Sequence, residues 1–209
     1  MNFGPVFAKL LLVIGIYAGA AGLLRLFYGM DEELRNCSRN CIVRKWLIYS
    51  TLVCALPVME MNVMSPVIWI SLWFLGIYFV VASVTDTLIC QVYDILQYIG
   101  VIGGGIWLWY QNPPADKGIA LLVFSLMQYG IFMRMYGNAD GMGYCVCSLY
   151  LAGAGFGLEG FLYQMLAGFL ILTLVQLFCC NINTKGQLKQ PIALFPYIIG
   201  GFMILWYSK

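Results

Sequence analysis

The stretch that decides the fold is residues 67–84, VIWISLWFLGIYFVVASV, an apolar run without a charged side chain. In a helix that rises ~1.5 Å per residue, a run of this length nearly spans the ~30 Å hydrocarbon layer of a membrane. Similar runs cover residues 5–28, 46–59, 95–110, 119–135, 144–158, 161–178 and 192–207. A β-barrel would instead show short segments that alternate apolar and polar residues. The sequence therefore predicts an all-α, polytopic transmembrane helical bundle of about eight helices.

The composition supports a membrane protein, because 62% of the 209 residues are hydrophobic and only 10% are charged. Too few polar groups are present to cover a water-soluble globule of this size. The breaks between the runs are short, so we expect residues 1–209 to form a single integral-membrane domain in the lipid bilayer. The net charge is +2 and the basic residues are scattered. Nucleic-acid binding is not expected, since no basic face can follow a phosphate backbone.

Several kinds of chemistry are excluded by residue type. The chain has no histidine, which rules out Ser-His-Asp triads and HExxH zinc sites. Its eight cysteines lie mostly in or beside apolar runs, where cysteine acts as a small hydrophobe. The pairs Cys37-x3-Cys41 and Cys145-x-Cys147 could each contribute to a metal site, but no pair at a recognisable zinc spacing completes either. We predict neither a metal nor a cofactor.

The distribution of basic residues predicts how the chain is oriented. Lysine and arginine in short loops stay on the cytoplasmic side. They cluster after the first, fifth and seventh runs, at Arg35, Arg39, Arg44, Lys45, Arg134, Lys185 and Lys189. We therefore expect a multi-pass protein of the plasma membrane, with the loops after odd-numbered helices in the cytoplasm and both termini outside.

Three of the nine Asp and Glu residues are not explained as solvated surface residues. Asp31, Glu32, Glu33, Glu60, Asp116 and Glu159 lie in predicted loops and are interpreted as solvated. Asp86, Asp94 and Asp140 border apolar runs instead. Two predicted helices separate Asp86 from Asp140, so both should reach the cytoplasmic edge of the membrane. Each could simply cap a helix. Two adjacent carboxyls can also share one proton, one activating water while the other polarises a carbonyl, which is aspartyl protease chemistry.

Short motifs around these carboxyls resemble those of a known family. Gly137-Asn138-Ala139-Asp140 resembles the GxGD signature of the intramembrane aspartyl proteases that process type IV prepilins and archaeal preflagellins. Asp86, Val92 and Asp94 match three of four positions of that family's earlier motif, where Tyr93 replaces proline. Residues 189–197, KQPIALFPY, resemble its basic loop and proline-rich segment. The resemblance implies that Asp86 and Asp140 are catalytic and that Gly137, Ala139, Gly141 and Asp94 support them.

The family resemblance also implies a reaction and a partner. Its members cleave the basic leader peptide from prepilin-like precursors after a glycine, at the cytoplasmic face of the membrane. Bifunctional members carry an additional domain with two CxxC pairs that is linked to N-methylation. Here residues 29–43 are too short for such a domain. We therefore expect cleavage of a prepilin-like substrate without N-methylation.

Two alternatives remain open from the sequence. The motif can instead be aligned with Gly141-Met142-Gly143-Tyr144, which places tyrosine where the family has aspartate. That alignment would describe a catalytically inactive member that serves as a subunit of a pilus or secretion assembly. A small proton-coupled transporter would also use carboxyls in the membrane. It should show carboxyls nearer the middle of helices and repeat symmetry, and the sequence shows neither.

Overall fold

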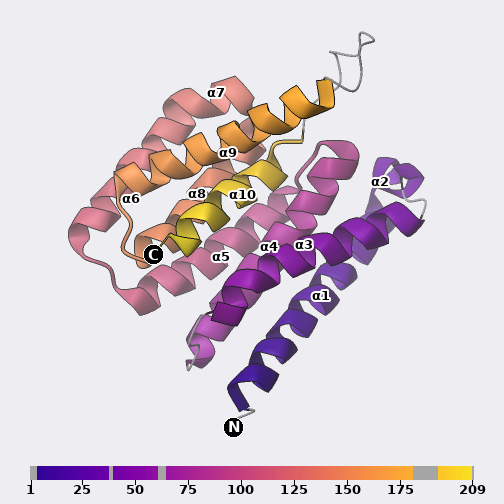
Figure 1. Ribbon diagram of the computed structural model, residues 1–209, viewed down its shortest axis with the longest axis horizontal. Helices are drawn as coiled ribbons and strands as arrows, with labels where there is room; N and C mark the ends of the chain where they lie inside the picture. Colours follow the sequence, from indigo (N-terminus) through magenta and orange to yellow (C-terminus); the bar gives the residue numbers. More distant parts are fainter. Residues whose placement is uncertain (1–3, 38–39, 61–64, 181–192, 209) are drawn as a thin grey trace. The chain divides into compact units, whose positions relative to one another are not determined.

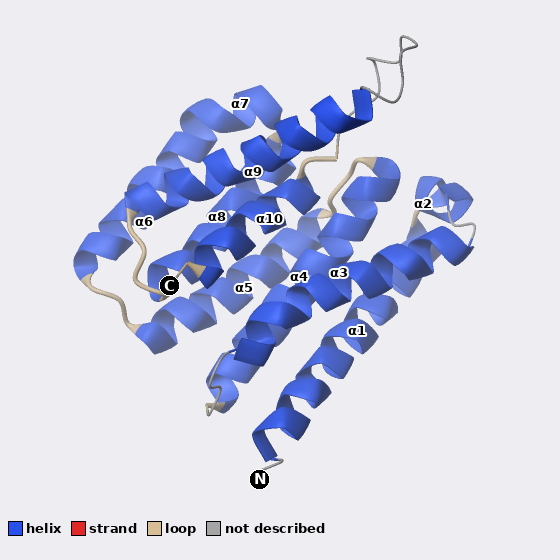
Figure 2. Ribbon diagram, in the orientation of Figure 1, coloured by secondary structure: helices blue, strands red, loops and turns tan. Residues whose placement is uncertain are grey.

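The computed structural model describes residues 4–37, 40–60, 65–180 and 193–208. Within those ranges the chain is helical with short connections and has no strand (Figure 2). The predicted all-α bundle is confirmed. The chain divides into two compact units, Met1–Asn112 and Pro113–Lys209.

Unit 1 is built around α4 (Figure 1). Its helices are α1 Gly4–Met30, α2 Glu32–Cys37, α3 Asn40–Glu60, α4 Pro66–Ile89 and α5 Asp94–Gln111. Helices α1, α2, α3 and α5 all contact α4, and α1 also packs on α2 and α3. The run quoted above, residues 67–84, is thus the central helix of this unit.

Local sequence explains where α4 begins and what holds it. The side chain of Ser65 accepts a hydrogen bond from the amide of Val67, and Pro66 occupies the first turn, where its missing N–H costs nothing. Two side chains of α4 then bond to α5. Ser71 Oγ donates to the carbonyl of Gly103 at 2.9 Å, and Tyr78 Oη donates to Gln97 Oε1 at 2.7 Å. Such bonds join helices in surroundings where apolar contacts discriminate little.

Unit 2 is built around α8. Its elements are α6 Ala115–Met127, a π-helix Gln128–Phe132, α7 Met133–Tyr136, α8 Asn138–Gly153, α9 Leu158–Cys180 and α10 Phe195–Tyr207. Helix α8 contacts α6, α7, α9 and α10 (Figure 1). Helices α9 and α10 approach so closely that a Cβ on Gly201 would collide with the α9 backbone at Gln164 and Gly168. Small residues permit this approach.

Three predicted boundaries are wrong. Residues 137–143 were expected to be a break, but only Gly137 is non-helical, because α8 begins at Asn138. Helix α4 continues to Ile89, so Asp86 lies inside a helix and not in a loop. Residues 46–59 predicted a short helix, whereas α3 has 21 residues. Helix α8 passes through Gly141 and Gly143, which pack closely on Met133 and Phe195, and α4 continues through the buried polar residues Thr85 and Asp86.

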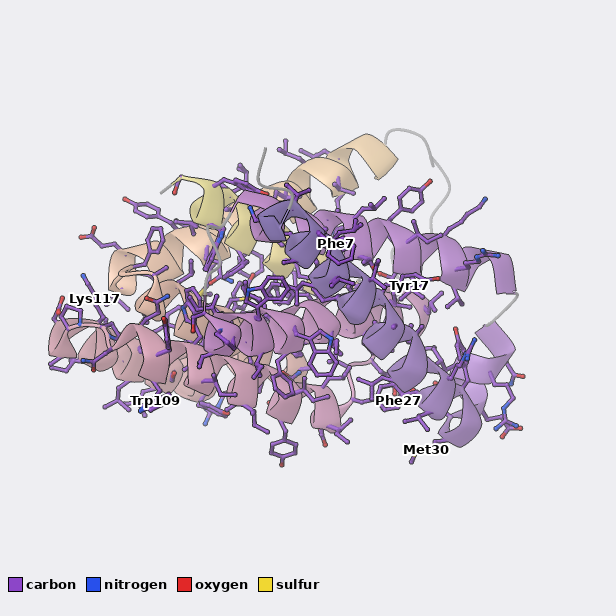
Figure 3. The ribbon with its side chains drawn as sticks, turned by 90° about the horizontal axis from the view of Figure 1, so that it is seen from below. Phe7, Tyr17, Phe27, Met30, Trp109 and Lys117 are labelled. Carbon is purple, nitrogen blue, oxygen red and sulfur yellow. The ribbon has the colours of Figure 1, made fainter. Side chains whose placement is uncertain are left out.

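Four helices of the described chain are long and apolar enough to cross a membrane. They are residues 6–30, 66–89, 115–136 and 158–177. Large apolar side chains such as Phe7 and Met30 project from α1 into the surroundings (Figure 3). These helices suggest a membrane protein. The eight predicted crossings and the predicted orientation of the chain in the membrane stay predictions. Arg39, Lys185, Lys189 and the start of the KQPIALFPY segment lie outside the described residues.

Candidate active site

Asp86 lies in the last turn of α4 and is buried, with 5% of its surface exposed. The helix ends four residues later, where Cys90 adopts a left-handed conformation (φ 52°) and donates its amide to the carbonyl of Asp86 at 2.8 Å. Neighbouring hydroxyls bond within the helix, since Thr85 and Thr87 donate to the carbonyls of Ala82 and Ser83. The regular end of α4 therefore brings one carboxyl into the interior of unit 1.

The turn between α4 and α5 is fastened to the start of α2. Tyr93 Oη donates to Asp31 Oδ2 at 2.6 Å, and the Tyr93 ring stacks on Phe27 with centroids 4.2 Å apart. Asp31 Oδ1 accepts from the amides of Glu33 and Leu34 at 2.8 and 3.2 Å, which caps α2. We call this arrangement of Phe27, Asp31 and Tyr93 the Tyr93 latch. Asp31, predicted to be solvated surface, is half-buried and also accepts these three hydrogen bonds.

Charge and burial perturb the groups around this turn. The hydrogen bond from Tyr93, followed by that from the Leu34 amide, lowers the pKa of the Asp31 carboxyl. Burial, followed by the bond to Asp31, raises the pKa of Tyr93. Partial burial, together with the negative charge of Asp86, raises the pKa of the exposed Cys90 thiol.

Asp140 lies in the first turn of α8 in unit 2 and is half-buried. The residue before this helix is Gly137, with φ 115° and ψ 158°, a backbone conformation that is essentially restricted to glycine. Its amide donates to the carbonyl of Met133, and its carbonyl accepts from the amide of Gly141. Asp140 Oδ2 lies 3.8 Å from the position that a Cβ on Gly137 would occupy. The first turn of a helix favours a negative charge.

The glycines that follow Asp140 serve packing. A Cβ on the buried Gly141 would collide with the side chain of Met133, and one on Gly143 would lie 2.9 Å from the Phe195 ring of α10. Tyr144 is fully buried, and its ring packs against Tyr136, with centroids 5.7 Å apart. The tyrosine that the alternative alignment puts in place of aspartate is therefore part of the core of unit 2.

Sequence reasoning missed the polar residues at the α7–α8 junction. Tyr136 ends α7, just before the helix that bears Asp140, and its ring packs on that of Tyr144. Tyr136 Oη in turn donates to Gln128 Oε1, and the fully buried Gln128 donates from Nε2 to Met165 Sδ at 3.0 Å. Gln128 begins the π-helix, an irregularity that is frequent at functional sites. No spacing in the sequence indicated this cluster.

The other predicted site residues, Asp94 and Ala139, are close in sequence to Asp86 and Asp140. Asp94 is exposed at the first position of α5, and Ala139 is half-buried beside Asp140. Among the described residues, no group of three or more His, Cys, Asp or Glu side chains could hold a metal ion. Cys145 and Cys147 are buried in α8, and the side chains of Cys37 and Cys41 lie outside the described part.

Each unit brings one predicted carboxyl together with its motif. Asp86 and Asp94 flank the same turn in unit 1, and Gly137, Ala139, Asp140 and Gly141 surround the α7–α8 junction in unit 2. The pairing of Asp86 with Asp140 in one catalytic site stays a prediction. Comparisons with protein families, known proteins and solved structures find no match.

Proposed function

We propose that the chain is a membrane-embedded aspartyl endopeptidase that removes the basic leader from prepilin-like precursors. The observation that carries the proposal is the burial of Asp86 at the end of α4, a helix of membrane-spanning length. An ionisable group in such a helix is rare and usually functional, because desolvating its charge is costly. Asp140 supplies the second carboxyl. It follows Gly137, whose backbone conformation other residues rarely adopt.

The proposed reaction needs only these two carboxyls and a water molecule. With one proton shared between them, the ionised carboxyl takes a proton from water as the water attacks the scissile carbonyl. The protonated carboxyl gives its proton to the carbonyl oxygen. The tetrahedral intermediate then collapses: the carboxyl that took the water proton gives it to the leaving nitrogen as the C–N bond breaks, and one hydroxyl of the intermediate returns a proton to the other carboxylate. Because the two carboxyls titrate as a pair, their roles are described jointly.

The substrate is expected to lie across the membrane boundary. Its basic leader would stay in the cytoplasm, on the side predicted for Arg35 of α2 and for Arg44 and Lys45 of α3. Its apolar stem would remain in the bilayer. A glycine before the scissile bond suits this site, because a segment without a side chain lets its backbone approach the carboxyls. No N-methylation is part of the proposal.

The decisive experiment is leader cleavage with one precursor and matched carboxyl-to-amide variants. The full chain and a pilin-like precursor with a basic leader, a glycine and an apolar stem are purified and mixed. We expect the wild-type chain to shorten the precursor after the glycine, and Asp86→Asn and Asp140→Asn each to reduce the rate at least 100-fold. Glu32→Gln makes the same chemical change on the exposed surface of α2 and should leave the rate unchanged.

The outcomes separate the proposal from its alternatives. An intact precursor in a stable complex with the wild-type chain would favour an assembly subunit. Substantial cleavage by Asp140→Asn would show that Asp140 is not required and would overturn the proposed carboxyl pair. Proton transport into vesicles that is lost with Asp86→Asn, without any cleavage, would favour a transporter.

A further inference from the structure

A second candidate site lies in unit 2, beyond the other end of α8 from Asp140. A cavity of about 700 Å³ is formed by the start of α6, the turn between α8 and α9, and the end of α10. Asp140 is in the first turn of α8 and the cavity begins after the last residue, Gly153, so the rest of the helix separates them by about 20 Å at 1.5 Å per residue. We call it the Lys117 cavity.

The Lys117 cavity presents both signs of charge. Lys117, at the beginning of α6 (Figure 3), keeps 28% of its side chain exposed and pairs with Asp116 at 3.2 Å. Glu159, at the start of α9, is exposed and lines the same cavity, as does Ser208. An ammonium group has three donors, so Lys117 can bind an anion while it contacts Asp116. A ligand with one phosphate and one primary ammonium group complements this set.

Glycine leaves room for that ligand beside the ammonium group. A Cβ on Gly157 would lie only 3.4 Å from Lys117 Nζ, so a larger side chain there would press against the charge. Gly155, two residues earlier, has φ 92° and makes the turn that opens the cavity. Gly157 thus leaves space beside the ammonium group of Lys117, although Phe156, between the two glycines, also lines the cavity.

Exposed apolar stripes begin at the rim and indicate that the ligand has acyl chains. On α6, Ile119, Leu122 and Leu126 are 61–63% exposed, and on α9 Tyr163, Leu166 and Leu170 are 60–63% exposed. Each stripe follows the spacing i, i+3, i+7, so each covers one face of its helix. Helices α6 and α9 contact each other and both begin at the cavity, so both stripes lead away from it.

We propose that the Lys117 cavity binds the headgroup of a phosphatidylethanolamine-type lipid, with its acyl chains along these stripes. Lys117 holds the phosphate, and Glu159 with Asp116 accepts hydrogen bonds from the primary ammonium. An anionic glycerol headgroup is disfavoured because two carboxylates outnumber one ammonium. A choline headgroup carries no N–H to donate to them. The lipid-binding site is independent of the proposed peptidase activity.

The test is retention of lipid by the purified full chain in detergent, measured by native mass spectrometry. Phosphatidylethanolamine, phosphatidylcholine and phosphatidylglycerol with identical acyl chains are offered at equal concentration. We expect one phosphatidylethanolamine to be retained at least tenfold more than either of the others. Equal retention of all three would overturn the proposal. Soluble glycerophosphoethanolamine should bind far more weakly, and binding equal to that of the lipid would overturn the role of the stripes.

Two variants link retention to the cavity. The double variant Lys117→Gln/Glu159→Gln removes one cation and one carboxylate from the cavity and is expected to abolish the preference for phosphatidylethanolamine. The control Arg44→Gln/Glu33→Gln removes one exposed cation and one exposed carboxylate from unit 1 and should keep this preference. Gly157→Val leaves every charge in place and should lower retention by crowding Lys117. Thermal melting identifies variants that retain the fold. Wild-type retention by folded Lys117→Gln/Glu159→Gln, or by folded Gly157→Val, would overturn the assignment.

Discussion

Asp86 and Asp140 are the same residue type, but the two units position them by opposite means. Asp86 lies in the last turn of a regular helix and is buried in unit 1, and the turn that follows this helix is held by the Tyr93 latch. Asp140 begins a helix after a π-helix, a four-residue helix and a glycine with positive φ. The first lies at the negative end of a helix dipole and the second at the positive end. Tertiary contacts thus place one carboxyl, while backbone conformation places the other.

Gly137→Ala tests whether backbone conformation positions Asp140, and it should cause the largest loss of stability among these substitutions. Alanine rarely adopts φ 115° and ψ 158°, so we expect a loss of about 1–3 kcal/mol in stability and a displaced Asp140. Gly118→Ala is the control, because Gly118 is helical and a Cβ there meets nothing within 4 Å. Thermal unfolding and leader cleavage measure both effects. A Gly137→Ala protein as stable as the control would contradict the role given to this conformation.

Gly143→Ala separates packing from backbone conformation in unit 2. Its Cβ would lie 2.9 Å from the Phe195 ring and 3.3 Å from Ile198, so α10 must shift slightly. We expect a loss of about 1 kcal/mol, at the low end of overpacking effects, because side-chain atoms can move. Thermal unfolding gives the value. If Gly143→Ala costs more than Gly137→Ala, packing and not backbone conformation dominates around Asp140.

Tyr93→Phe removes the hydrogen bond of the Tyr93 latch and keeps the ring on Phe27. The melting temperature should fall by a few degrees at neutral pH. Because the bond lowers the pKa of Asp31 in the folded state, its stabilisation is complete above the ordinary value of 3.8 and is lost as pH falls below it. The melting temperature of Tyr93→Phe should therefore depend less on pH between about 5 and 3. A pH dependence identical to that of the wild type would contradict the latch.

Cys90→Gly should have the smallest effect, and a stabilising one. Cys90 ends α4 with φ 52°, where glycine has no steric cost, and its thiol is exposed. We expect a gain of up to about 0.5 kcal/mol after the extra entropy of glycine in the unfolded chain. Chemical or thermal unfolding in the same detergent gives the difference. A marked loss would mean that the Cys90 side chain supports the end of α4.

The sequence predicted the fold well because apolar runs of membrane length leave few alternatives. Each of the eight runs is helical over most of its length: run 119–135 covers parts of α6, the π-helix and α7, and residues 67–84 lie in α4, the central helix of unit 1. Its errors came from polar and glycine residues interpreted as loops. Asp140 is in a helix because the first turn accepts an acidic residue, and Gly141 is in one because it packs on Met133.

The candidate site could be predicted only where a local pattern marks it. The GxGD-like motif identified Asp140 and its neighbours, and the end of an apolar run identified Asp86. Gln128 and Tyr136 carry no such pattern, since their contact depends on the π-helix between them. Tyr93 appeared only as a departure from the family motif, yet it bonds to a residue 62 positions away. Long-range partners of this kind leave no trace in local spacing.

The π-helix also sets the rotational phase of everything that follows it. One residue more than an α-helical turn needs advances the downstream helix by about 100° around its axis. Deletion of a single residue such as Gly130, which is exposed and whose added Cβ would meet nothing, should return the segment to α-helix. Tyr136 would then turn away from Gln128, and the residues that lead into α8, which bears Asp140, would be rotated. A one-residue deletion is thus expected to rotate the segment that follows it and not to unfold it.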